Sequence, residues 1–285
     1  MKPLFNSILI SLIFIVVCSS TTVSAQDKGK LVVQATDITI SPELLAQSAG
    51  VMSDRLITYG MKTNISVIYD KAQIVVDIPG NINKSEVAQL LTGKGNLGFY
   101  ETLTLSEIKE SLKNENRESL NDFQANPSDS RIACAASKDP GMEEKIQNYL
   151  KQNGLSANTR LLWSKTNSNS QTCLYILKTD NAGNPPMVRS DIETISSSKD
   201  NNSRSFSIKI KFTPEAAKKW ADLTGRNLDK PIPIVIDDMI YYTPVVKTAM
   251  EGGLCEITGD LSEKETSFFL ALVNNGNLPA HFTVK

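Results

Sequence analysis

The sequence predicts an α+β protein built from antiparallel sheets. Residues 206–212 (FSIKIKF) alternate between apolar and polar side chains, which is typical of a half-buried strand. Ser/Thr-Pro-Glu helix starts occur at residues 41–43 and 213–215. Short apolar runs bounded by turn residues, as in QIVVDIPG at residues 73–80, predict hairpins.

Composition excludes several classes of function. The chain has 285 residues with 30 Lys and Arg against 31 Asp and Glu, so the formal net charge is −1 and offers no field for nucleic acid. With 40% hydrophobic residues, the chain can bury a core. The single histidine, His281, is predicted to be a strand residue, and no nucleophile motif accompanies it. We therefore expect a protein that is not an enzyme.

The first 25 residues are predicted to be a signal peptide. An apolar run at residues 8–17 is followed by Val-Ser-Ala at residues 23–25, which places small residues before a cleavage point. We therefore expect an exported, periplasmic protein. One alternative is a lipoprotein anchored through Cys18, although Val17 stands where such signals have a small residue. An uncleaved anchor is the other.

Residues 26–103 are predicted to form a first lobe. Its helix begins at Ser41, carries apolar residues at helical spacing, and ends at Gly60. The elements expected here are strands at 31–34, 65–69, 73–78 and 96–103, with helices at 41–60 and 84–92. Their order, βαββαβ, predicts a ferredoxin-like lobe with two helices on one face of a four-stranded antiparallel sheet.

Residues 104–185 are predicted to form a variable α+β middle region. The elements expected here are helices at 105–120 and 139–152, a loop at 121–130, and strands at 131–136, 160–164 and 172–177. Cys134 and Cys173 lie in short apolar runs, which favours buried thiols on strands. Because export permits disulfides, a Cys134–Cys173 bond is the alternative, and Cys255 would remain unpaired.

Residues 186–285 are predicted to form a second α+β lobe that repeats the βαββαβ order. The polar stretch at 196–205 (SSSKDNNSRS) predicts a mobile loop. The elements expected after it are strands at 206–212, 232–236 and 240–246, helices starting at Thr213 and Ser262, and an extended segment at 278–284. We expect this final segment to return toward the first lobe.

No cofactor, metal or catalytic site is predicted. Gly93, Gly95 and Gly98 spell G-x-G-x-x-G, but a helix precedes them and a strand follows, which is the reverse of a dinucleotide-binding motif. Asp237 and Asp238 are better explained as a hairpin turn than as metal ligands.

Tyr241 and Tyr242 follow that predicted turn. Strand alternation would place one of the two rings on each face of the sheet, so one of them is expected in a surface groove.

Several segments resemble the periplasmic domain of SecD, from the SecDF-type membrane proteins of protein export. They are GGLCEITG at 252–259, GNLPA at 276–280, IVIDDMIYYTPVV at 234–246 and LLTGKGNLGFYE at 90–101. The resemblance covers residues 38–103 and 186–284. The transmembrane part of that family is not found in this sequence, and Asp238 stands where the family usually has the glycine of a tight turn.

The resemblance implies a base lobe, a protruding head lobe and a role in protein export. It implies binding of translocating or unfolded polypeptide and contact with Sec membrane components, without a cofactor. Tyr241, Tyr242 and the 196–205 loop are the expected place of peptide binding. The alternative function is a structural or envelope-assembly module that binds one folded protein partner.

Overall fold

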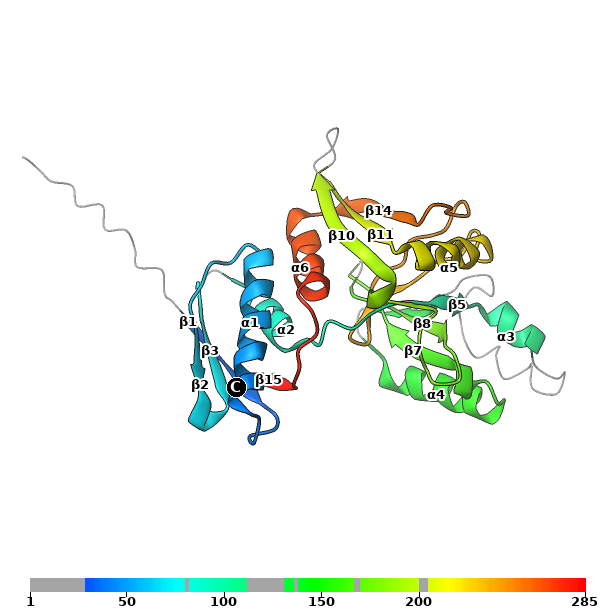
Figure 1. Cartoon of the computed structure of the whole chain (residues 1–285). Coiled ribbons are helices and arrows are strands. Elements are labelled where there is room, and N and C mark those ends of the chain that lie inside the picture. Colours follow the sequence, from blue (N-terminus) through cyan, green and yellow to red (C-terminus); the bar gives the residue numbers. More distant parts are fainter. Residues whose placement is uncertain (1–28, 80–81, 112–130, 136–137, 167–169, 200–204) are drawn as a thin grey trace, which may run out of the picture.

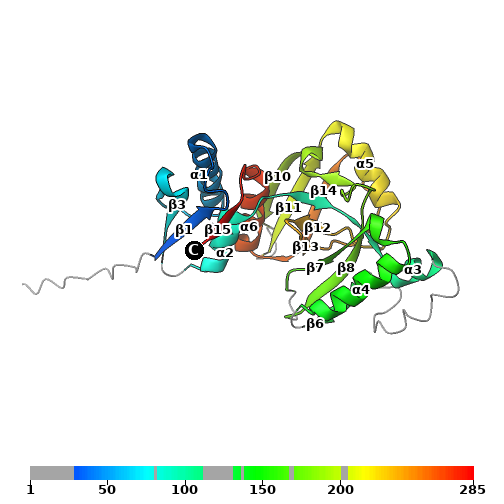
Figure 2. The same cartoon turned by 90° about the horizontal axis from the view of Figure 1, so that it is seen from below.

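The computed structural model describes residues 29–79, 82–111, 131–135, 138–166, 170–199 and 205–285. It contains helices and four antiparallel sheets, so the predicted α+β class is confirmed. The molecule is elongated: a base lobe lies at one end, and a head lobe and a middle region lie beside each other at the other end (Figures 1 and 2).

The base lobe consists of one sheet covered on one face by two helices. Its strands are β1 (Gly29–Ala35), β2 (Ile65–Ile68), β3 (Gln73–Ile78) and β15 (Phe282–Val284), and its helices are α1 (Pro42–Thr58) and α2 (Lys84–Thr92). The Ser41 side chain accepts a hydrogen bond from the Leu44 N–H, so the predicted N-cap starts α1. Met52 of α1, Val76 of β3 and Leu91 of α2 meet in one buried core.

The strand order of this sheet, β15-β1-β3-β2, corrects one expectation. Residues 96–103 were expected to be its fourth strand, but β15 takes that edge and places Val284 opposite Val33. The order is compatible with a ferredoxin-like sheet whose last strand comes from far along the chain. Residues 96–103 instead break at Tyr100, whose N–H donates to the Pro233 carbonyl, and each half joins a different sheet.

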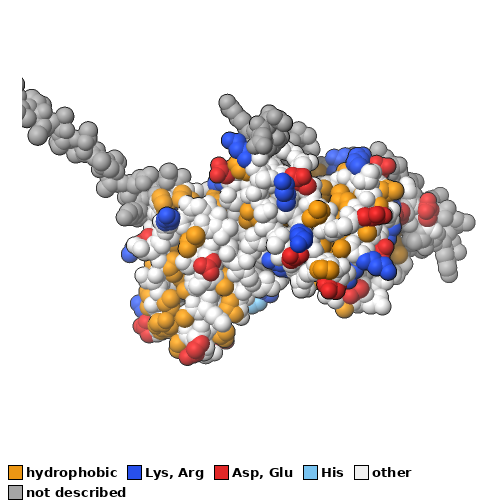
Figure 3. Space-filling model, turned by 45° about the horizontal axis from the view of Figure 1, so that its top comes forward, with side chains coloured by type: hydrophobic (Ala, Val, Ile, Leu, Met, Phe, Trp, Pro, Cys, Tyr) orange, Lys and Arg blue, Asp and Glu red, His pale blue; other side chains and the backbone are white. Residues whose placement is uncertain are grey.

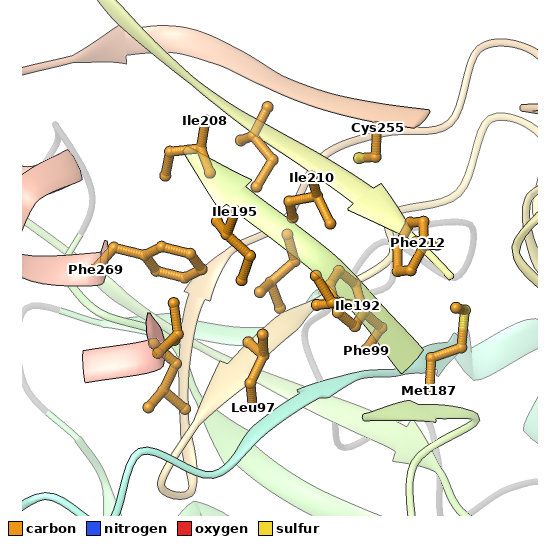
Figure 4. Close-up of a cluster of buried hydrophobic side chains, with 14 of the residues drawn as sticks. Leu97, Phe99, Met187, Ile192, Ile195, Ile208, Ile210, Phe212, Cys255 and Phe269 are labelled. Atoms are coloured by element: carbon orange, nitrogen blue, oxygen red, sulfur yellow. The ribbon is translucent and has the colours of Figure 1, made fainter. Parts of the chain in front are cut away.

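The head lobe has two sheets and two helices around the largest core. Its strands are β4 (Leu97–Phe99), β9 (Met187–Val188), β10 (Ile192–Lys199), β11 (Phe206–Phe212), β12 (Ile234–Ile236), β13 (Met239–Tyr242) and β14 (Leu254–Leu261), and its helices are α5 (Pro214–Gly225) and α6 (Glu263–Asn274). One sheet has the order β10-β11-β14, and the central sheet has the order β13-β12-β4-β9. Phe99, Phe212 and Phe269 fill the space between them (Figure 4).

Two expectations for the head lobe are wrong. Residues 196–199 belong to β10 and pair with β11, so the expected 196–205 loop does not begin at 196; residues 200–204 lie outside the described part. The βαββαβ order is not repeated, because β14 pairs with β11 while β12 and β13 belong to the central sheet. Gly253, at φ +69°, leads into β14 at a point where an added Cβ would lie 2.7 Å from Ala217, so only glycine fits this turn.

The middle region is a small sheet packed under the head. Its elements are β5 (Glu101–Leu103), α3 (Leu105–Ser111), β6 (Arg131–Ala135), α4 (Pro140–Gln152), β7 (Thr159–Trp163) and β8 (Thr172–Lys178). β5, β6 and β7 all pair with β8. Residues 112–130, which include most of the expected 105–120 helix, lie outside the described part, as do the expected signal peptide and Cys18.

The base and head lobes meet around Arg55 of α1, whose side chain is fully buried. Its guanidinium donates to the carbonyls of Leu90 and Lys94 at 3.0 Å, to that of Gly93, and to that of Gly276 at 3.0 Å. These acceptors lie on the two chain segments that connect the lobes, so one side chain holds both connections. Burial lowers the Arg55 pKa to about 10, and the charge of Asp237 opposes this shift.

Within the described residues, no helix combines the length and the apolar character needed to cross a membrane.

Candidate functional site

An open groove of about 640 Å³ runs along the central sheet where the head meets the middle region. Gly98 of β4 lies in its floor, and an added Cβ there would approach Pro185 to 2.9 Å. Glycine at this position therefore lets Pro185 lie directly on the sheet. The groove is bordered by β9, the last strand of the central sheet.

The groove combines side-chain amides with apolar surface. Asn96, Asn184 and Asn277 all line it and are exposed, and the Asn277 amide donates to the Asn96 side-chain oxygen at 2.8 Å. Val188 and Val235 supply apolar lining. An amide side chain both donates and accepts hydrogen bonds, as a peptide backbone does, so this lining suits an extended polypeptide.

The two aspartates of the β12–β13 turn have separate structural roles. Both have positive φ angles, +48° for Asp237 and +69° for Asp238, which identifies the tight turn expected from the sequence. The Asp237 carboxylate accepts hydrogen bonds from the Gly95 and Asn96 N–H groups, both at 2.9 Å. Asp238 lines the groove and forms an ion pair with Arg160 of the middle region at 2.6 Å.

Tyr241 and Tyr242 pack against α6. The Tyr241 ring stacks on Phe268 with 6.2 Å between ring centres, and the Tyr242 ring lies 5.3 Å from Phe269. The Lys165 ammonium lies 4.5 Å from the centre of the Tyr241 ring. Burial raises the pKa of both tyrosine hydroxyls.

The expected placement of one tyrosine ring on each face of the sheet is therefore wrong. Both rings pack against the head core, because the register between β12 and β13 shifts between Ile234 and Val235. The outer edge of β13 is also partly occupied, since the Lys165 N–H donates to the Ile240 carbonyl at 2.7 Å. A role of the two tyrosines in peptide binding stays a prediction.

The cysteines of the middle region face each other across two strands. Cys173 of β8 is disulfide-bonded, and its register partner on β6 is Cys134. The favoured expectation of a free buried thiol is therefore wrong for Cys173. The register suits the alternative, a Cys134–Cys173 bond, and this pairing remains a prediction. Cys255 is a buried free thiol, and burial raises its pKa to about 12, so it is unreactive at neutral pH.

Residues 183–190, which form one wall of the groove, were not expected as part of a site. The sequence Asn184-Pro185-Pro186 is typical of a break between regular elements and carries no signal of a binding site. The resemblance to SecD, which begins again at residue 186, was the one signal that reached part of this wall.

The fold and groove define the chain as an α+β protein with antiparallel sheets, arranged as a base lobe, a head lobe and a middle region. Residues 164–280 match the family model "SecDF, P1 head subdomain". The resemblance stated from the sequence is therefore confirmed.

Curated relatives extend this likeness. The chain is 31% identical over 109 residues to the protein translocase subunit SecDF of Thermus thermophilus, which covers 38% of this chain and 15% of that protein. It is 24% identical over 211 residues to the SecD subunit of Petrotoga mobilis, covering 73% of this chain and 38% of that protein. The chain thus spans well under half the length of these relatives.

A solved structure of a membrane component SecDF that enhances protein export is also similar. It has 22% sequence identity and a TM-score of 0.46, and the match covers 90% of this chain and 97% of that one.

Proposed function

We propose that this chain is a SecD-like accessory module of protein export that binds translocating or unfolded polypeptide in the periplasm. The observation that carries the proposal is the groove beside β9, which lies within a head lobe that matches the SecDF head subdomain. Sec membrane components are proposed as its protein partners, by analogy with the relatives named translocase subunits. The proposal includes no chemical step on the polypeptide.

An extended segment would lie along the groove with its main chain hydrogen-bonded to the exposed side chains of Asn96 and Asn277. The edge of β9 offers less, because the Val188 N–H already donates to the Asp191 carboxylate at 2.9 Å. Main-chain pairing is independent of sequence, so it supplies affinity without strong selectivity. Val188 and Val235 would favour apolar side chains. For so unspecific a contact we expect a Kd in the micromolar range, about −8 kcal/mol.

A binding titration with matched variants tests this function. A fluorescently labelled, reduced and unfolded protein is titrated with the purified chain and with Ser190→Arg, which extends a long side chain from an exposed groove residue. Ser85→Arg places the same side chain at an exposed position on α2, away from the groove. We expect Ser190→Arg to weaken binding at least fivefold and Ser85→Arg to leave it within twofold.

The tyrosine site is tested in the same titration. The double variant Tyr241→Ala, Tyr242→Ala should weaken binding if the partly exposed rings of the two tyrosines also contact the peptide. Binding that responds to neither the groove nor the tyrosine variants would discard both sites and keep the function. If the parent chain shows no binding at about 100 μM, the polypeptide-binding function is refuted and the folded-partner alternative stands.

A further inference from the structure

The outer edge of β2 in the base lobe has unpaired main-chain groups. Among the described strands β2 pairs with β3 alone and ends the sheet. The Asp77 N–H donates to the Asn64 carbonyl at 3.0 Å, and hydrogen-bonded pairs alternate along an antiparallel ladder. Ser66 and Ile68 therefore bond to β3, while the N–H and C=O groups of Ile65 and Val67 point away from the sheet.

A small apolar notch of about 260 Å³ lies beside this edge, between α1 and the chain entering β2. Leu56 and Ile57 form its helix side, and Met61 and Ile65 form its strand side. Ile57 is 58% exposed although it is a large aliphatic residue. Hydrophobic side chains also gather over the base lobe in the space-filling view (Figure 3).

The β2 edge lacks the charged residues that both edge strands of the β10-β11-β14 sheet carry. Exposed edges are commonly protected by charged residues or proline. The edge strand β10 carries Glu193 and Lys199, and the edge strand β14 carries Glu256 and Asp260. The sequence of β2, Ile-Ser-Val-Ile, has no charge and no proline.

We propose that β2 accepts an extended apolar segment of an unfolded polypeptide as an added strand, with one of its side chains in the notch between α1 and β2. The proposal rests on the polypeptide-binding function above and adds a second site, in the base lobe. Strand addition uses the two free donors and two free acceptors of Ile65 and Val67, and an extended backbone presents the matching groups at the same repeat.

The charge beside the notch indicates which peptide segments would bind there. Lys62 is the one charged residue that lines the notch, and the other lining residues are neutral. The site therefore suits a segment that is apolar or carries an acidic neighbour, and it disfavours segments rich in Lys and Arg. An unfolded chain supplies such segments in extended form, whereas a folded partner would have to offer an open, uncharged edge of its own.

The test combines amide signals with a matched pair of variants. An apolar, uncharged ten-residue peptide is titrated into the isotope-labelled protein, and amide shifts and hydrogen exchange are followed by NMR. We expect the Ile65 and Val67 amides to shift and to exchange at least fivefold more slowly. Ile57→Gln should weaken the peptide's effect at these amides about tenfold, while Leu44→Gln, on the same helix and 41% exposed, should leave it within twofold.

The possible outcomes separate this site from the groove. Ser190→Arg should leave the Ile65 and Val67 signals unchanged. If the peptide binds but shifts only amides of the head lobe, the base-lobe site is refuted and the proposed function survives. If the peptide binds nowhere, both are refuted. The parent protein's amide signals decide the matter even if Ile57→Gln fails to fold.

Discussion

The two junctions of the head lobe differ in their central contacts. The head meets the base through Arg55, which is buried and donates to main-chain carbonyls, without a carboxylate among its hydrogen-bond partners. The head meets the middle region through partly exposed ion pairs, Arg160–Asp238 at 2.6 Å and Arg226–Glu101 at 2.7 Å, beside a small apolar core. The first junction therefore concentrates four buried hydrogen bonds on one side chain, beside the Lys264–Glu86 ion pair and the Tyr59–Phe268 ring contact. The second junction has no such central side chain among its described contacts and is spread over several weaker ones.

This difference has a physical basis. A buried cation that is removed leaves carbonyls without donors in a place that water does not reach, and each such group costs about 1–3 kcal/mol. An exposed ion pair that is removed is replaced by water and salt ions at little cost. Four substitutions test the comparison, and they follow from the largest expected effect to the smallest.

Arg55→Met should cause the largest loss. It removes the guanidinium hydrogen bonds to the Leu90, Gly93, Lys94 and Gly276 carbonyls, so we expect the free energy of unfolding to fall by about 4 kcal/mol. Urea unfolding at equilibrium measures this change. Arg160→Met is the control with the same side-chain change at a partly exposed site. Equal effects of the two substitutions would remove the distinction between the junctions.

Asp237→Ala should follow, with a loss of about 2–3 kcal/mol. It removes the acceptor of the Gly95 and Asn96 N–H groups and places alanine at a φ of +48°. Asp237→Asn keeps one acceptor oxygen and tolerates this φ, so it should lose less than half as much. Thermal unfolding measures which of the two variants loses more stability. Hydrogen exchange at the Gly95 and Asn96 amides should be faster in both variants than in the parent.

Glu101→Gln should cost about 1–2 kcal/mol at neutral pH. Burial tends to raise the Glu101 pKa, but the hydrogen bonds from Arg226 and Asn227 outweigh it, and the net pKa is lowered. A carboxyl group whose pKa is lowered in the folded state stabilises the fold at any pH above its unfolded-state pKa. This stabilisation is lost as the pH falls through the folded-state pKa. The difference in unfolding free energy between the parent and Glu101→Gln should therefore begin to shrink as the pH falls below the ordinary glutamate pKa, and it should vanish once the folded-state carboxyl is protonated. A constant difference from pH 7 to pH 3 would contradict this.

Arg160→Ala should have the smallest effect, under about 1 kcal/mol. Because the Arg160–Asp238 pair is partly exposed, its contribution should shrink further between about 20 mM and 500 mM salt. Unfolding of both proteins at the two salt concentrations measures it. An effect as large as that of Asp237→Ala would mean that this pair also holds the groove in shape.

Local structure was predictable because its causes are local. The helix that begins after Ser262 has its capping box with Glu265, and the alternation of residues 206–212 produced β11. Sheet membership was not predictable in the same way. The run at residues 96–103 has one β pattern, yet its two halves serve the head and the middle region, because the choice of partner depends on Pro233 and on β8.

The candidate site was predictable only in part. The sequence pointed to the head lobe, where the groove lies, and to the tight turn at Asp237 and Asp238. It could not reveal that a register shift turns both tyrosines toward α6, because such a shift does not change the alternation of apolar and polar residues in the sequence. The Arg55 contacts were equally hidden, since main-chain carbonyls carry no sequence signal.

The pairing of β15 with β1 has a consequence for the order of folding. Val33 lies opposite Val284, so this contact closes a loop that contains the whole head lobe and middle region. Contacts this distant along the chain form slowly, and the entropy of closing the loop is lower once the intervening lobes are already compact. We therefore expect the head to fold first and the base sheet to be completed last. Until then β1 has an open edge beside an apolar face, and this is the interval in which a newly synthesised chain is most exposed to aggregation and proteolysis.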